Sequence, residues 1–222
     1  MNSYIKALKN EFELNSNPII ASQQKAYMRN QFSFFGLKTP ERRKIQQPFL
    51  IKDFLPVKKD AIKIIKELWL LPQRDFQYFA QELAHKYIKQ PEESDIELYE
   101  FMVVNRSWWD TVDYIANKLM GSYFLVYPEK RYEYVKKWLA SNNIWLQRCA
   151  ILFQLKYKEK LDKELLTHTI KSLLNSKEFF INKAIGWILR EYSRTDPEWV
   201  ISFTTQNKLH PLSKKEALKL LD

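Results

Sequence analysis

The chain has 222 residues, with 36 basic and 26 acidic side chains and a net charge of +10, so an anionic partner such as nucleic acid is expected. Only three glycines occur, which argues against a β-rich fold, a dinucleotide-binding fingerprint and a phosphate-binding loop, because each depends on glycine. One cysteine excludes an internal disulfide, and three scattered histidines without ligand partners at metal spacing predict no metal site and no cofactor.

The N-terminal segment is amphipathic and lacks the continuous apolar run of a signal peptide. No stretch approaches the roughly 20 apolar residues that span a membrane. We therefore expect a cytoplasmic protein with no membrane association. The length allows one domain, and we expect residues 1–222 to form that single domain as a monomer.

Apolar residues recur at helical spacing from the first segment, residues 4–12, onward. A second helix is predicted over residues 18–32, with Gly36 as its C-terminal cap. A third helix begins at Thr39 as the N-cap, and Pro48 kinks or ends it. These elements are short and separated by breaks, which is typical of an all-α chain.

The chain becomes more regular after residue 60, where apolar faces alternate with breaks. A helix over residues 108–120 is closed by Gly121. Asp196 opens another helix, and Ser213 with Glu216 forms a capping box that opens the last one. No convincing strand is found. The remaining helical faces are predicted at residues 61–69, 76–88, 96–103, 132–139, 144–157, 166–173 and 181–192.

The helices come in pairs, and the second member of successive pairs opens with an aromatic residue. These residues are separated by 32, 37 and 34 positions, and they are Phe76, Trp108, Trp145 and Phe179. Helix pairs at this interval indicate an α-solenoid of TPR, HEAT or armadillo type. The predicted fold is an all-α, HEAT-like helical-repeat α-solenoid. Its antiparallel helix pairs would stack into a curved array with a concave basic face, large enough for a duplex or a partner protein.

One stretch, Ser107-Trp-Trp-Asp-Thr-Val-Asp113, places two tryptophans directly before two carboxylates. On a helix, Trp109 and Asp113 share one face because they are four residues apart. An indole attracts a flat cation by about 0.5–2 kcal/mol, and a carboxylate there could act as a base or stabilise developing positive charge. The plainer interpretation makes the tryptophans core residues and Asp113 solvated or ion-paired, and the heptapeptide alone favours it.

Arg148 is surrounded on its predicted helix by aliphatic residues, so it must either find an acid or line a cleft. Asp113, one helix pair earlier, is the candidate acid. In the register set by the opening aromatics, Trp109, Asp113 and Trp187 share a helical phase and Arg148 does not. Either the register slips there or Arg148 points elsewhere. Gly186, which is costly inside a helix, is expected to permit a close backbone approach.

Basic residues recur toward the ends of the second helices, as Lys156, Arg190 and Arg194. Spaced along a curved array, they could follow a phosphate backbone. The alternative is that each complements the helix dipole at a C-terminus. For any single residue, the alternative is the simpler interpretation.

Four segments, in order and over nearly the whole chain, resemble the AlkD family of DNA alkylation repair glycosylases. The resemblance implies a HEAT-like-repeat fold that holds duplex DNA on a concave basic face. It also implies removal of positively charged alkylpurines, such as 3-methyladenine and 7-methylguanine, by cleavage of the N-glycosidic bond, which leaves an abasic site. The segments are Thr39-Pro-Glu-Arg-Arg43, Ser107-Trp-Trp-Asp-Thr-Val-Asp113, Asn143-Ile-Trp-Leu-Gln-Arg148 and Phe179-Phe-Ile-Asn-Lys-Ala-Ile-Gly-Trp187.

Residue by residue, the resemblance implies that Trp109 and Trp187 are cleft tryptophans, Asp113 is the catalytic carboxylate and Arg148 is a cleft arginine on a nearby phosphate. Lys38, which departs from the amide side chain of relatives, is placed among the DNA-binding positions. The complete implied set of DNA-binding residues is Lys38, Arg43, Lys156, Arg190 and Arg194.

The family chemistry fits the residues. Alkylation makes the purine a good leaving group, and bond cleavage leaves oxocarbenium-like charge that the Asp113 carboxylate can stabilise while it orients or deprotonates water. Whether the base enters a pocket stays open. Two other functions also stay open, namely a non-catalytic HEAT-repeat scaffold for nucleic acid or protein, and a catalyst that acts on structured RNA.

Overall fold

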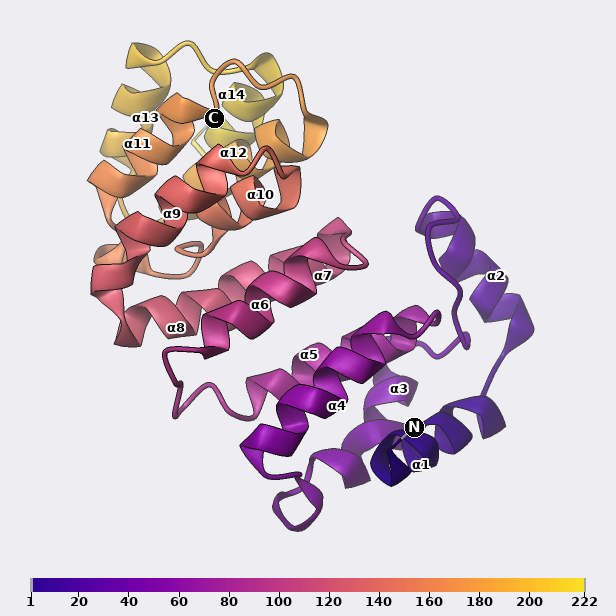
Figure 1. The fold of residues 1–222 in the computed structure, drawn as a ribbon. Coiled ribbons are helices and arrows are strands. Elements are labelled where there is room, and N and C mark those ends of the chain that lie inside the picture. The colour runs from indigo at the N-terminus through magenta and orange to yellow at the C-terminus, as the bar shows by residue number, and fades with distance from the viewer. Residues whose placement is uncertain (1, 222) are drawn as a thin grey trace. The chain divides into compact units, whose positions relative to one another are not determined.

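The computed structural model describes residues 2–221, and every regular element in that range is helical (Figure 1). An isolated β-bridge joins Ser33 and Gln73, and no strand forms within residues 2–221. The all-α prediction is therefore confirmed. The chain divides into two compact units, Met1–Gln90 and Pro91–Asp222. The expectation of a single domain over residues 1–222 stays a prediction.

The first unit is built on buried apolar faces that the sequence predicts. Residues Ile5, Leu8 and Phe12 of the first helix are fully buried, and the Phe12 ring lies 5.8 Å from that of Phe76. A three-residue connection, Leu71–Gln73, makes α4 (Lys58–Leu70) and α5 (Arg74–His85) packed neighbours. The elements of this unit are α1 (Ser3–Leu14), α2 (Pro18–Tyr27), α3 (Thr39–Gln46), η1 (Gln47–Leu50), η2 (Lys52–Phe54), α4 (Lys58–Leu70) and α5 (Arg74–His85).

The end predicted for the second helix is wrong. Helix α2 stops at Tyr27, because Arg29 and Asn30 adopt left-handed backbone conformations that a helix cannot continue. Gly36 is not a helix cap. It lies in the following irregular segment with a left-handed φ of 86°, and a Cβ there would lie only 2.0 Å from the Asn17 carbonyl oxygen at the start of α2.

The third helix begins one residue earlier than predicted. Lys38 is its N-cap and Thr39 its first helical residue, and the Lys38 backbone N–H donates to a Glu41 carboxylate oxygen at 3.3 Å. The helix ends at Gln46, before Pro48, as predicted.

The second unit repeats a helix pair four times. The first members are α6 (Asp95–Val104), α9 (Arg131–Ala140), α11 (Lys163–Ser172) and α13 (Pro197–Gln206). The second members are the continuous helix α7 (Trp109–Tyr114), η3 (Ile115–Met120) and α8 (Gly121–Val126), then α10 (Ile144–Leu152), α12 (Phe179–Tyr192) and α14 (Pro211–Leu218). Second members pack on one another, α7 and η3 on α10, α10 on α12 and α12 on α14 (Figure 1). This arrangement confirms the predicted helical repeat. Short 3₁₀ turns, η4 (Pro128–Lys130) and η5 (Lys158–Lys160), lie in connections.

Gly121 does not close a helix, which corrects the sequence prediction. Its φ of −58° is helical, and the helix continues to Val126 through the π-helical turn η3. A Cβ at Gly121 would lie 2.7 Å from the Phe153 carbonyl oxygen. Glycine is therefore needed here for close packing of one repeat on the next. The Tyr157 hydroxyl also donates to the Gly121 carbonyl at 2.6 Å.

The start predicted for the last helix is also wrong. The N-cap is His210, whose ring nitrogen accepts from the Leu212 N–H at 3.2 Å, and α14 begins at Pro211. Ser213 is therefore inside the helix, and it does not form a capping box. Its buried hydroxyl instead donates to the Asn182 carbonyl of α12 at 2.7 Å. By contrast, Asp196 caps α13 as predicted.

Candidate active site

Asp113 and Arg148 form a two-pronged ion pair between α7 and α10. Arg148 Nε donates to Asp113 Oδ1 at 2.6 Å, and Arg148 Nη2 donates to Oδ2 at 2.9 Å. The arginine side chain is 4% exposed and the aspartate 17% exposed. Two charge-assisted hydrogen bonds of this kind fix the relative orientation of the two side chains and also strengthen their interaction. The pairing of Arg148 with Asp113 is therefore confirmed, and the compatible role of Arg148 in lining a cleft stays a prediction.

The pairing follows from the repeat. Helices α7, α10 and α12 begin at Trp109, Ile144 and Phe179, successive positions 35 residues apart. Asp113 and Arg148 are each the fifth residue of their helix, and they are also 35 residues apart. The register set by the opening aromatics therefore slips at α10.

The slip has a local cause. Among the aromatics that mark the helix starts, Trp108 is the N-cap of α7, Trp145 is the second residue of α10 and Phe179 is the first residue of α12. Aromatic residues near a helix start thus do not occupy one fixed position. Equivalent helix positions, and not equivalent aromatics, decide which side chains meet.

An aromatic cluster lies at the N-terminal ends of these three helices, beside the ion pair. The Trp108 ring lies 5.7 Å from Trp145 and 5.4 Å from Phe180, and Trp145 lies 5.0 Å from Phe180. Arg148 Nη1 donates to the Phe180 carbonyl oxygen, and the guanidinium lies 6.0 Å from the Phe180 ring. Trp108 thus packs against other aromatic side chains beside the site while it stays partly exposed.

Two opposed effects act on the Asp113 carboxyl. Burial raises its pKa above the ordinary aspartate range, and the hydrogen bonds and charge of Arg148 act in the opposite direction. The net direction is upward. The neighbouring Cys149 thiol is fully buried, and burial raises its pKa well above the usual value, so it is an unreactive core residue.

Trp109 and Trp187 both remain partly exposed. Trp109 lies one turn before Asp113 on α7, so the two side chains share a face. Trp187 is on α12, which also packs on α10, the helix that carries Arg148. The four residues assigned to the chemistry thus come from three successive second helices. Their roles in catalysis stay predictions.

The predicted DNA-binding residues fall in both units, and four of the five are held by a carboxylate. Lys38 is exposed at the N-cap of α3. The other four pair with glutamates of second helices: Arg43 with Glu82 at 3.3 Å, Lys156 with Glu191 at 2.6 Å, Arg190 with Glu216 at 2.7 Å and Arg194 with Glu191 at 4.0 Å. These positions therefore have specific partners in addition to any favourable effect of a helix dipole.

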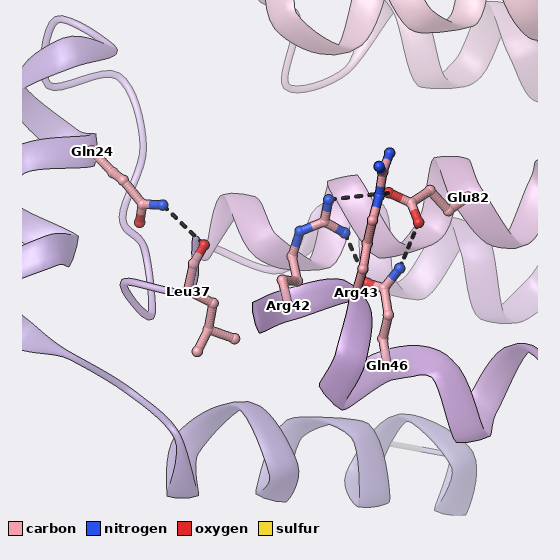
Figure 2. A network of polar contacts seen from close by, with 6 residues as sticks. All are labelled: Gln24, Leu37, Arg42, Arg43, Gln46 and Glu82. Carbon is pink, nitrogen blue, oxygen red and sulfur yellow. Dashed lines mark hydrogen bonds and ion pairs between the residues drawn. The ribbon is translucent and has the colours of Figure 1, made fainter. Parts of the chain in front are cut away.

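Figure 2 shows the network around Glu82 of α5 in the first unit. Glu82 Oε1 accepts from Arg42 Nη2 at 3.0 Å and from Arg43 Nε at 3.3 Å, and Oε2 accepts from Gln46 Nε2 at 2.6 Å. Arg42 Nη1 also donates to Gln46 at 2.8 Å. Arg42 is buried, whereas Arg43 is 60% exposed with its guanidinium end directed away from the network (Figure 2).

The sequence pattern gave no sign of Glu82, and it assigned Glu216 to a capping box and not to the ion pairs that it forms with Lys183 and Arg190. A glutamate in a helical pattern carries no local sign that it will bridge two helices. The only available signal is position, because each glutamate is next to a buried helical residue, Gln81 before Glu82 and Ala217 after Glu216. Such a signal is too common to be specific.

No group of three or more potential metal ligands clusters anywhere in residues 2–221. Within the same residues, no helix is both long and apolar enough to cross a membrane.

Comparison with known proteins agrees with this architecture. A family model for the DNA alkylation repair enzyme matches residues 8–221. A solved structure described as a predicted DNA alkylation repair enzyme from Enterococcus faecalis is 32% identical, with a TM-score of 0.87 over 93% of this chain and 96% of that chain. No curated protein sequence matches. The match of the family model over nearly the whole sequence means that the chain belongs to the DNA alkylation repair enzyme family.

Proposed function

We propose that the protein is a monofunctional DNA glycosylase that releases N3- and N7-alkylated purines from duplex DNA. The substrates are 3-methyladenine and 7-methylguanine, the reaction is hydrolysis of the N-glycosidic bond, and the product is an abasic site. We further propose that it acts as a monomer in the cytoplasm. Membership of the DNA alkylation repair enzyme family supports an enzyme that acts on DNA.

One observation carries the proposal for the chemistry. The Asp113 carboxylate is fixed by two hydrogen bonds from buried Arg148, yet 17% of its side chain stays exposed. Each carboxylate oxygen has two acceptor positions, so these two bonds leave acceptor capacity. A fixed, largely buried carboxylate on the same helix face as Trp109 suits a substrate that is flat and becomes cationic at the sugar.

The reaction places a specific demand on Asp113. Alkylation at N3 or N7 gives the purine a positive charge, so it departs readily as a neutral base. Cleavage of the C1′–N bond leaves oxocarbenium-like charge on the deoxyribose. The Asp113 carboxylate stabilises that charge and orients or deprotonates the water that attacks C1′, in the manner of a glycoside hydrolase.

Arg148 serves the same chemistry through Asp113. Its guanidinium donates to both Asp113 oxygens and to the Phe180 carbonyl, and its side chain is 4% exposed. These contacts support a positioning role for Arg148, which holds the carboxylate in one orientation and favours its ionised form. The contact with a DNA phosphate implied by the family resemblance stays a prediction.

Trp109 and Trp187 would pack against the sugar and the lesion, and the exposed cations would bind the phosphate backbone. Arg43 supports this role, because Glu82 holds only its Nε while its side chain remains 60% exposed. No lysine occurs in the motif around Asp113. The base is therefore displaced by water and not by an amine of the protein.

The test is release of free base from duplex DNA treated with a methylating agent. We expect chromatography to detect 3-methyladenine and 7-methylguanine, and we expect strand breaks to appear only after the abasic sites are cleaved by alkali. Borohydride should trap no covalent protein–DNA adduct. No release by folded protein that still binds DNA would favour the non-catalytic scaffold, and release from methylated duplex RNA in preference to DNA would favour the RNA catalyst.

A further inference from the structure

Glu216 of α14 joins two cations of α12. Glu216 Oε1 lies 2.8 Å from Lys183 Nζ, and Oε2 lies 2.7 Å from Arg190 Nη1. The glutamate is only 13% exposed, whereas Lys183 is 39% exposed. Both cationic nitrogens therefore lie beside one carboxylate and close to each other, and the group of three carries a net charge of +1.

Gly186 makes this arrangement possible. A Cβ at Gly186 would lie 2.5 Å from Glu216 Cβ and 2.9 Å from the Ser213 carbonyl oxygen. Only a glycine lets α14 approach α12 this closely without displacement. The close backbone approach expected at Gly186 is thus confirmed, and the approaching helix is α14. Because Lys183 and Arg190 lie on either side of Gly186 along α12, the carboxylate of Glu216 can reach both.

The two cations lie on either side of Trp187. Lys183, Trp187 and Arg190 follow one another at intervals of four and three residues, so they share one face of α12. All three are partly exposed, whereas Ile185 and Ile188 between them are buried. The exposed face of α12 therefore presents an indole between two cations that are fixed from one side.

We propose that Lys183 is a phosphate-binding residue and that Glu216 is a positioning residue, which holds Lys183 and Arg190 together to bind one DNA phosphate beside Trp187. The proposal rests on the proposed function, and it adds two residues that the family resemblance does not assign. The group's net charge of +1 suits the single negative charge of a phosphodiester. Arginine has five N–H donors, and its bond to Glu216 through Nη1 leaves donors for a second anion.

Two opposite electrostatic effects of Glu216 have to be compared. Its negative charge repels a phosphate, but its bonds hold two long side chains that would otherwise lose rotamer freedom on binding. Lys183 lowers the pKa of Glu216, so the carboxylate stays ionised at neutral pH. We expect the ordering of the two side chains to outweigh the repulsion of the phosphate, because both cations are held at hydrogen-bond distance from Glu216 before DNA binds.

The first test is equilibrium binding of the full chain to a duplex with a stable abasic-site analogue, measured over a range of salt concentrations. Lys183→Ala should weaken binding several-fold and make the plot of log K against log salt less steep by about 0.9, the loss of one phosphate contact. Lys171→Ala, an exposed lysine on the first-member helix α11, is the matched control and should change neither quantity. If Lys183→Ala binds like the wild type with the same salt dependence, Lys183 only tethers two helices and the proposal is wrong.

Glu216→Ala tests positioning, because the two possible roles predict opposite signs. We expect weaker DNA binding although the variant removes a negative charge, and partial recovery in Glu216→Gln, which keeps an acceptor. Tighter binding by Glu216→Ala would overturn the positioning role. Thermal unfolding of each variant verifies that it is folded at the assay temperature.

The same preparations separate this proposal from the proposed function. Release of 7-methylguanine by the wild type with unchanged DNA binding in Lys183→Ala would reject the phosphate site alone. Weakened DNA binding in Lys183→Ala, with no base release by the wild type, would support the phosphate site and reject the glycosylase.

Discussion

Asp113 and Arg148 occupy the same position, the fifth, in helices that begin 35 residues apart, and their side chains meet through two hydrogen bonds of 2.6 and 2.9 Å. The repeat thus brings an acidic and a basic side chain from equivalent helix positions together where α7 packs on α10. An ion pair set by equivalent positions in neighbouring repeats has consequences for stability, for pH dependence and for catalysis.

The first consequence concerns stability. Arg148→Met should lower the free energy of unfolding by about 3–5 kcal/mol, because it leaves the Asp113 carboxylate without its counter-ion in a buried place. The double variant with Asp113→Leu should lose less than the sum of the two single variants, since the uncompensated charge is gone. Urea unfolding of the four proteins measures the coupling. Additive losses would show that the two side chains do not interact in solution.

The second consequence concerns pH. Burial raises the pKa of Asp113 above the ordinary value of about 3.9. If the ionised carboxylate is required, the acidic limb of the single-turnover rate should lie above that value. Arg148→Met should move the limb to still higher pH, because Arg148 lowers the pKa of Asp113. A limb at or below about pH 3.9 would contradict the assignment of this limb to Asp113.

The same raised pKa affects folding. The folded chain binds the Asp113 proton more tightly than the unfolded chain does, so this group stabilises the fold most below the unfolded pKa. That contribution is lost as pH rises through the folded pKa. Asp113→Asn should remove this part of the pH dependence, which urea unfolding between about pH 3.5 and 7 can detect.

A separate prediction concerns the Glu82 network of the first unit. Glu82→Ala should destabilise the fold by about 3–5 kcal/mol, because buried Arg42 loses its carboxylate partner. Arg43→Ala should change stability by at most about 0.5 kcal/mol, since its side chain is largely exposed. It should weaken DNA binding and reduce the salt dependence by about 0.9. Lys63→Ala, on the exposed surface of α4, is the control for loss of one positive charge and should bind DNA like the wild type.

Another prediction concerns the close approach of α14 at Gly186. Gly186→Ala should destabilise the fold by about 1–3 kcal/mol through overpacking against Glu216 and Ser213. Alanine otherwise favours a helix over glycine by about 1 kcal/mol, so a stabilised variant would show that α14 does not approach α12 as closely as the structure has it. Thermal unfolding decides the sign.

The sequence predicted the helices and their pairing well because both depend on local apolar spacing. It failed where a contact between distant residues decides the backbone. Gly121 has the pattern of a helix end, but the approach of the Phe153 carbonyl requires glycine within a continuing helix. Ser213 has the pattern of a cap, but its hydroxyl bonds the Asn182 carbonyl from inside α14.

The candidate site shows the same contrast between residues that local sequence identifies and contacts that depend on the packing of distant helices. The sequence named Asp113 as the candidate partner of Arg148, and the family resemblance named the tryptophans. The register between the two helices could not be found, because aromatic residues near helix starts differ in position by up to two residues. The bridging roles of Glu82 and Glu216 arise only when helices distant in sequence pack together.

The central claim is that the Asp113 carboxylate performs the reaction, and single-turnover release of 7-methylguanine by Asp113→Asn tests it most directly. Glu97→Gln, on the exposed surface of α6, removes the same charge from the same helix pair and should react like the wild type. We predict a rate at least about tenfold lower for Asp113→Asn, equivalent to ~1.4 kcal/mol, with DNA binding largely retained. Equal rates for Asp113→Asn and the wild type would remove Asp113 from the mechanism.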